Sequence, residues 1–205
     1  MSPRTPLLNP HEYFADRDDP FPTGLLVFVL HVAVDILLLF VLVHLLFSRI
    51  ENPPKGLQGE LTNMLVGVLP VGLLLYGLAW LIVAAMMHGF IGGSSTDGSF
   101  RDALGVAGWA YAPELITAPA TLGFTWYQLS QLHLDGSDTA QLAAELEAIE
   151  SATFHPVSLA ILLLVTGWSL CMLARGIAAT HNVSVSETLF PALLIGVGSF
   201  LLALI

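Results

Sequence analysis

The sequence predicts an all-α integral membrane protein, folded as a bundle of five transmembrane helices. Hydrophobic residues make up 55% of the 205 residues and charged residues only 11%, whereas soluble domains carry about 25% charged residues. Apolar runs long enough for the ~20 residues that cross ~30 Å of hydrocarbon recur along the chain. Polar stretches with glycine, proline and acidic residues separate these runs. Such a chain is expected to cross a bilayer several times.

Residues 1–23 are expected to form a cytoplasmic N-terminal segment outside the five-span membrane domain of residues 24–205. The segment contains five prolines, which fix φ and remove amide donors, so no long helix is predicted there. Apolar and aromatic side chains spaced along it favour a position at the membrane surface. The first span is predicted at 24–47, with Thr23 as its N-cap.

The second and third spans are predicted at 65–91 and 103–127. Ser99 and Asp102 have the spacing of a capping box, so the third helix is expected to begin there. Two prolines, the first of them Pro113, lie inside this helix. Each proline removes a backbone hydrogen bond, and the third helix is therefore predicted to kink.

The last two spans are predicted at 157–179 and 188–205, after an acidic loop at 128–157 that contains no Lys or Arg. Apolar residues recur in this loop at helical spacing, opposite several glutamates. This pattern predicts a short amphipathic helix on the membrane surface between the third and fourth spans. Asp138 and Gln141 have the spacing of a capping box for it.

The distribution of Lys and Arg predicts the orientation in the membrane, because these residues are more frequent in cytoplasmic loops. With five spans, the N-terminus shares one side with the loops at 92–102 and 175–187, and this side holds four arginines. The other side holds only Arg49 and Lys55. We therefore expect a multi-pass protein of the cell membrane, with a cytoplasmic N-terminus and an external C-terminus.

Short motifs are spread over most of the chain. A Pro-x-x-aromatic-Phe segment with Pro10 and Phe14 lies just before the first span, a polar turn runs into the third span, and a tryptophan lies in the fourth. The residues of the last two motifs are Gly92, Gly93, Gly98, Ser99, Phe100, Gly108, Trp109, Pro113 and Trp168. With these motifs the chain resembles the Yip family, small five-span membrane proteins first known as Ypt/Rab-interacting proteins. The resemblance is to the prokaryotic members.

The resemblance implies a five-helix bundle with the N-terminus in the cytoplasm, and a structural role for the motif residues. In eukaryotic members it implies binding of Rab GTPases and a part in vesicle traffic. Those relatives have a long cytosolic N-terminal region, whereas this chain has 23 residues before the first span. A Rab-type GTPase is therefore not an expected partner.

Three ionisable side chains lie inside predicted spans. His31 and Asp35 are four residues apart on one helix face, and Glu114 lies near the middle of the third span. An ionisable group in the hydrocarbon region costs about 2.5–3.5 kcal/mol, so these side chains need partners. One interpretation is a hydrogen-bonded clamp between helices. The alternative is that all three converge as a proton or cation site, because carboxylate and imidazole are suitable ligands.

Motifs of other chemistry are few. Met86, Met87 and His88 close the second span, where a flexible apolar helix end is favoured over a soft-metal contact. The sequence contains no H-E-x-x-H, G-x-S-x-G or phosphate-loop motif, so no enzyme activity, cofactor or metal ion is expected. The net charge of −10 argues against a nucleic-acid partner.

These observations favour a non-enzymatic membrane protein of the Yip family that acts as a scaffold or membrane-organising factor. Its expected partners are the lipid bilayer and either another protein or a second copy of the chain. The alternative is a small cation or proton transporter or channel that uses His31, Asp35 and Glu114. Replacing Asp35 by asparagine separates the two, because a scaffold should tolerate the loss of charge and a cation site should not.

Overall fold

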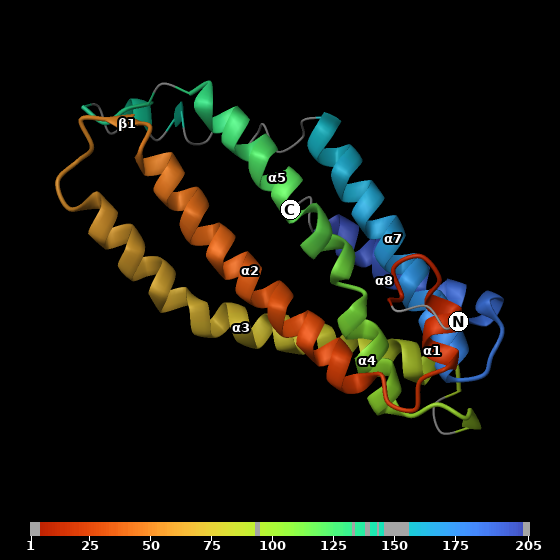
Figure 1. Ribbon diagram of the computed structural model, residues 1–205. Helices are drawn as coiled ribbons and strands as arrows, with labels where there is room; N and C mark the ends of the chain where they lie inside the picture. The colour runs from red at the N-terminus through yellow and green to blue at the C-terminus, as the bar shows by residue number, and fades with distance from the viewer. Residues whose placement is uncertain are drawn as a thin grey trace.

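The computed structural model describes residues 5–92, 95–132, 134–137, 140–142, 144–145 and 156–202. Its helices are α1 (Pro10–Ala15), α2 (Phe21–Phe47), α3 (Leu57–Phe90), α4 (Phe100–Trp109), α5 (Ala112–Ser130), α7 (Pro156–Thr180) and α8 (Val185–Leu202). Two short strands, β1 (Ile50–Glu51) and β2 (Leu134–Asp135), pair in parallel. The described part of the chain is thus nearly all-α, as predicted, and Figure 1 shows its helices arranged along one long axis. Gly93, and most of the amphipathic helix predicted after Asp138, lie outside the described residues.

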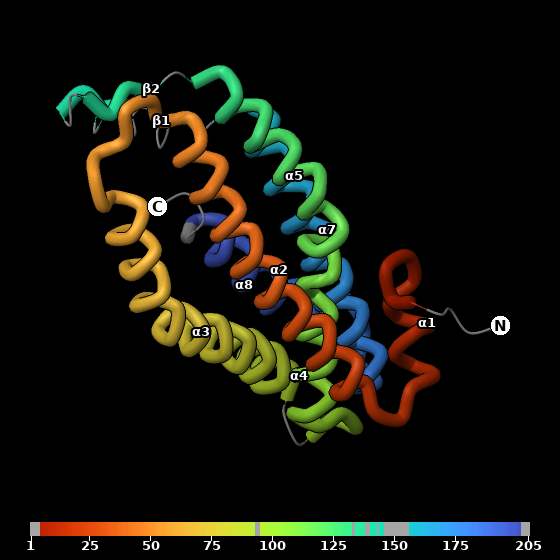
Figure 2. Tube along the Cα trace, turned by 60° about the vertical axis from the view of Figure 1, so that its left-hand side comes forward, coloured from red at the N-terminus to blue at the C-terminus, as the bar shows by residue number. Residues whose placement is uncertain are grey.

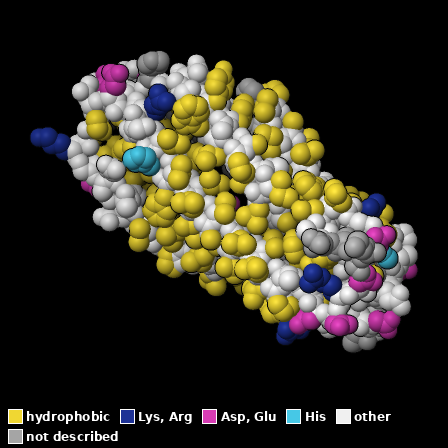
Figure 3. All heavy atoms as spheres, in the orientation of Figure 1, with side chains coloured by type: hydrophobic (Ala, Val, Ile, Leu, Met, Phe, Trp, Pro, Cys, Tyr) yellow, Lys and Arg dark blue, Asp and Glu magenta, His cyan; other side chains and the backbone are white. Residues whose placement is uncertain are grey.

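Among the described residues, three helices, α2, α3 and α7, are long and apolar enough to cross a membrane. The apolar helix α8 is shorter. Large hydrophobic side chains are exposed along these helices, among them Leu74, Leu164 and Phe190. Figure 3 shows a broad hydrophobic surface across the middle of the molecule, with the charged side chains at its two ends. This distribution fits a bilayer around the middle of the bundle.

Helix α3 begins at Leu57, eight residues before the predicted start of the second span. It contains Pro70, and Figures 1 and 2 show it bent along its length, with its first half standing away from α2. Its second half packs against α2 and α4: the indole of Trp80 stacks on Phe28 of α2 at 4.6 Å and donates to the Leu104 carbonyl of α4 at 3.0 Å. The second half of α3 is therefore the part that joins the bundle.

The predicted third span consists of two helices. Helix α4 ends at Trp109 and α5 begins at Ala112, with Ala110 and Tyr111 between them. Pro113 lies in the first turn of α5, where backbone amides have no partner within the helix, so the amide hydrogen that proline lacks is not needed there. The predicted kink of one helix over 103–127 at its prolines is thus not confirmed, because the chain forms two helices that meet before Pro113. The capping box is confirmed, since the Asp102 amide donates to Ser99 Oγ and the Ser99 amide donates to the Asp102 carboxylate.

Helices α2 and α4 cross at three glycines. A Cβ atom added to Gly24 would collide with the Gly105 backbone, and one added to Gly108 would collide with the Gly24 backbone. Only residues without a side chain allow the two backbones to approach this closely. The crossing places the start of α2 directly against the centre of α4, and most of the buried core lies at this end of the bundle.

At the opposite end, β1 and β2 join the end of α2 to the segment after α5. Ile50 pairs with Leu134, and Leu142 packs on both. Neither strand was predicted, because two residues are too few to show an alternating pattern.

Candidate functional site

The N-terminal motif packs into the bundle rather than standing apart from it. Tyr13 and Phe14 on α1 are each only 2% exposed. The Phe14 ring lies over Gly176 of α7, where a Cβ atom would come within 2.9 Å of it, and the Tyr13 ring meets the Trp109 indole edge-on at 5.6 Å. The indole of Trp168 donates to the Leu7 carbonyl at 2.9 Å. Motif residues that are far apart in the sequence thus form one packed cluster.

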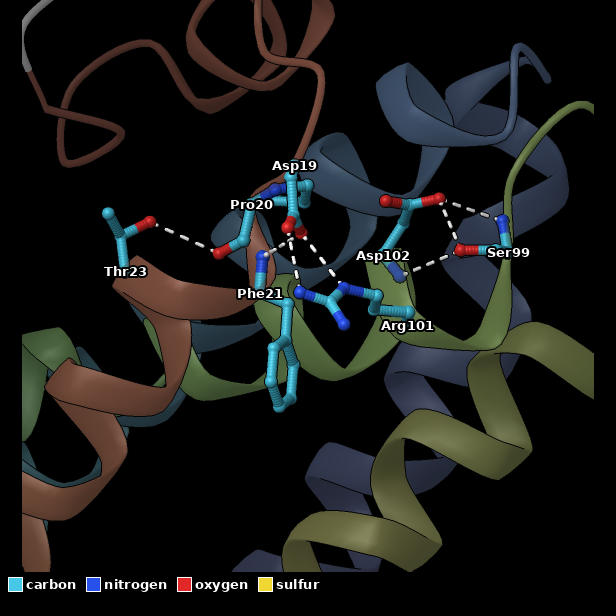
Figure 4. Close-up of polar contacts among 7 residues, drawn as sticks. All are labelled: Asp19, Pro20, Phe21, Thr23, Ser99, Arg101 and Asp102. Atoms are coloured by element: carbon cyan, nitrogen blue, oxygen red, sulfur yellow. Dashed lines mark hydrogen bonds and ion pairs between the residues drawn. The ribbon is translucent and has the colours of Figure 1, made fainter.

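A second set of contacts joins the start of α2 to the start of α4, and Figure 4 shows it in close-up. Arg101 donates to both carboxylate oxygens of Asp19, at 3.2 and 2.8 Å, and its guanidinium lies over the Phe21 ring. These hydrogen bonds hold the pKa of Asp19 below its ordinary value. The Phe21 amide donates to Asp19 Oδ1 at 3.1 Å. Asp19 therefore accepts a hydrogen bond from the first amide of α2. The Thr23 hydroxyl lies inside the helix and donates to the Pro20 carbonyl, so the prediction of Thr23 as the N-cap is wrong.

The polar turn before α4 lies on a pair of histidines. Gly98 faces the ring of His181, which a Cβ atom at that position would overlap, and His181 is 1% exposed. His181 Nε2 lies 3.0 Å from Nδ1 of His88, the last basic residue of α3. The pair ties the end of α3 to the turn between α7 and α8. Sequence reasoning singled out His88 with its two methionines but could not identify His181 as its neighbour.

The neighbours of the histidine pair determine where its protons lie. The Thr180 hydroxyl donates to the Gly176 carbonyl at 3.1 Å, which leaves its oxygen to accept from His181 Nδ1 at 3.0 Å. His181 Nε2 then carries the lone pair and accepts from His88 Nδ1–H. Protonating His181 at Nε2 would turn this acceptor into a donor, so the hydrogen bond would persist only if His88 moved its own proton from Nδ1 to Nε2.

Burial lowers the pKa of His181 from its ordinary 6.5, and the neighbouring His88 lowers it further, while the Asp102 carboxylate opposes the shift. A base with a lowered pKa binds protons more readily in the unfolded chain. This contribution to stability is therefore complete above about pH 6.5 and is lost as the pH falls from there toward the lowered pKa of His181.

The intramembrane residues predicted from the sequence come together in the middle of the bundle. His31 Nε2 lies 3.4 Å from Asp35 Oδ2 and 3.4 Å from Glu114 Oε2, so one imidazole nitrogen faces two carboxylates. His31 is 2% exposed and its ring stacks on Tyr111 at 4.6 Å. The Tyr76 hydroxyl donates to Asp35 Oδ2 at 2.7 Å. We call His31, Asp35, Tyr76 and Glu114 the intramembrane cluster.

Two features of the cluster indicate that not all of its polar groups are satisfied by hydrogen bonds within the protein. His31 Nδ1 is buried and has no hydrogen-bond partner. The two acids, in contrast, are open on one side, with their side chains 32% exposed at Asp35 and 46% at Glu114. Both line a cavity of about 280 Å³ between α2, α5 and α7. Glu114 also lines a smaller cavity of about 110 Å³ against α7 and α8, where Ser169 Oγ has no partner.

The three predicted residues thus belong to one site, whereas Tyr76 and Tyr111 were not predicted as members. Tyr76 reaches the site from α3, whereas Tyr111 lies directly before α5, three residues from Glu114. Within the described part of the chain, no group of three or more His, Cys, Asp or Glu side chains is arranged to hold a metal ion. The remaining motif residues lie elsewhere: Gly92 adopts a positive φ of 105° in the polar turn, and Phe100 meets the His88 ring edge-on.

Comparison with known protein families identifies a domain family that this chain matches. The model of the Yip1 domain matches residues 5–205, which is essentially the whole chain. Neither the curated proteins nor the solved structures include one that matches. The match agrees with the packing of the N-terminal motif, the polar turn and Trp168 into one cluster, and the chain belongs to the Yip1 domain family of membrane proteins.

Proposed function

We propose that the protein is a non-enzymatic scaffold that organises the membrane around it. The observation that carries the proposal is the way the motif residues meet. Aromatic rings of α1 pack against the Trp109 indole of α4 and against Gly176 of α7, and Trp168 of α7 donates to the Leu7 carbonyl. These contacts build a rigid end of the bundle rather than the wall of a pocket. An end of the bundle held by three helices is suited to presenting a fixed surface to a partner.

The topology that we propose for this scaffold has five spans. Helices α4 and α5 together provide the third crossing and α8 the fifth, with the N-terminus cytoplasmic and the C-terminus external. The excess of arginine on the N-terminal side supports this orientation. Cysteines placed at Thr5 and Lys55 of a Cys171→Ser background should react with an impermeant maleimide from the cytoplasmic and external sides, respectively. Reaction of both from the same side would contradict the topology.

Vesicles of phosphatidylethanolamine and phosphatidylglycerol, loaded with increasing amounts of the purified chain, test the scaffold. We expect the chain to change vesicle size and shape in proportion to the amount of protein, as seen by electron cryomicroscopy. Phe14→Ala, which removes the ring buried over α7, should abolish the change. Leu8→Ala, at a 90% exposed position of the same segment, is the matched control. Vesicles unchanged by the folded wild-type chain would refute the proposal.

The intramembrane cluster supports a second candidate, a cation or proton pathway. Two carboxylates share one imidazole nitrogen, and all six Lys and Arg residues lie outside the predicted centres of the spans. The cluster can hold both acids ionised only if it also holds a cation. A pH-sensitive dye trapped in vesicles tests the pathway: wild-type protein should carry protons down a gradient, and Asp35→Asn and Glu114→Gln should not. Equal, background-level flux in all three would exclude it and leave the scaffold.

A further inference from the structure

The cavity beside the acids has the chemistry of a ligand site. Its walls are mostly apolar and include Leu38, Phe124 and Ile161, while Asp35 and Glu114 supply carboxylates on one side. Sites for small molecules are typically concave and largely apolar, with a few polar groups that fix orientation. Here the charged groups of the wall are both acidic.

The charged side chains near this cavity determine which charge a ligand must carry. His31 is the one basic side chain among the titratable groups that meet at the cluster, and the others are Asp35, Tyr76, Tyr111 and Glu114. His31 is buried behind the acids, whereas the acids themselves are partly exposed toward the cavity. An anion would face two carboxylates, and a neutral apolar molecule would leave both carboxylates with His31 as their one counter-charge in the cluster.

The depth of the cavity in the bundle determines whether a water-soluble or a lipophilic ligand fits it. Asp35 lies near the middle of the 27-residue helix α2, so the cavity lies deep in the apolar part of the bundle. Thr117, Thr121 and Thr125 follow Glu114 along the cavity wall on α5, and the other wall residues are largely hydrocarbon. A small hydrated metal ion would lose its water shell here for two carboxylates, whereas a cation surrounded by its own apolar groups has little hydration to lose.

From this geometry we infer that the cavity between α2, α5 and α7 binds a lipophilic organic cation, such as a quaternary ammonium or phosphonium ion, with Asp35 and Glu114 as its counter-charges. The inference rests on the second candidate function, because it names the kind of cation that the cluster takes. Protons compete for the same carboxylates, so the ligand binds more weakly as the pH falls.

Equilibrium dialysis of radiolabelled tetraphenylphosphonium against the full-length chain in detergent micelles tests the inference. We expect saturable binding that is roughly tenfold weaker, equivalent to about 1.4 kcal/mol, in Asp35→Asn and in Glu114→Gln. Glu60→Gln, which removes an exposed acid from the first turn of α3, should bind as the wild type does. Tetraphenylborate, an anion of the same shape, should not bind to the wild type, and this comparison needs no variant to fold.

Equal binding of the phosphonium and the borate, or unchanged binding in both acid variants, would overturn the inference. The result is independent of transport. Phosphonium binding without proton flux in vesicles would retain the site and reject the pathway. Proton flux without phosphonium binding would retain the pathway and reject the organic cation.

Discussion

Replacing Gly105 by alanine should loosen the crossing between α2 and α4. A Cβ atom at this position would lie 2.6 Å from the carbonyl carbon of Pro20 and 2.7 Å from the amide nitrogen of Phe21. Both are backbone atoms, so no change of side-chain rotamer can relieve the contact. The two helices must instead move apart.

The size of the movement follows from the same distances. Ordinary contact begins at 3.4 Å, so the start of α2 must retreat by about 0.8 Å. A gap of 0.5–1 Å forfeits about a quarter to a half of the dispersion energy of the atoms that face it. Extra methyl groups in packed cores typically cost about 1–3 kcal/mol, and we expect Gly105→Ala to lower the free energy of unfolding by an amount in this range.

Unfolding in mixed micelles with increasing dodecyl sulfate, followed by tryptophan fluorescence, measures this loss. Gly77→Ala is the matched control, since Gly77 lies inside helix α3 with no atom within 4 Å of an added Cβ. Alanine in a helix is favoured over glycine by about 0.5–1 kcal/mol, so this control should be neutral or stabilising. If Gly105→Ala is as stable as Gly77→Ala, the close backbone contact of α2 and α4 does not exist in the membrane protein.

Three further predictions concern single contacts. Lowering the pH from 7.5 to 5.5, a range of about two units around the ordinary pKa of histidine, should lower the thermal stability of the wild type more than that of His181→Gln. Equal losses of stability in the two proteins would contradict the role of the pair with His88. Tyr76→Phe removes the hydrogen bond to Asp35 and should lower the free energy of unfolding by about 0.6–1.7 kcal/mol in the dodecyl sulfate titration. A change in this free energy near zero would show that the hydrogen bond does not stabilise the bundle. Trp168→Phe should speed hydrogen exchange in the segment before α1, and unchanged exchange there would argue against its indole as the tether.

Local features of the sequence were enough to predict the class of protein and several contacts. Hydropathy alone indicated the membrane, because a span must be apolar over a fixed length. The shared face of His31 and Asp35 followed from four-residue spacing, and the capping box of Ser99 and Asp102 from three-residue spacing. Each of these features depends only on the geometry of a single helix.

Where a helix stops was harder to predict. The apolar pattern continues through Ala110 and Tyr111, yet α4 ends there and α5 starts again beyond them. A continuous apolar stretch is compatible with one helix or with two, since both bury the same residues. The close packing of α4 against α2 and α3 adds contacts that a pattern along one segment does not contain.

The sequence by itself thus determined a membrane protein of long apolar helices, with an acid and a histidine on one face of the first span. Only the tertiary structure brought Glu114 and Tyr76 to that face and paired His88 with His181. The physical reason is that helix propensity and hydropathy act over a few neighbouring residues. Contacts between residues 41 to 93 positions apart, such as Tyr76 with Asp35 and His88 with His181, depend on how whole helices cross.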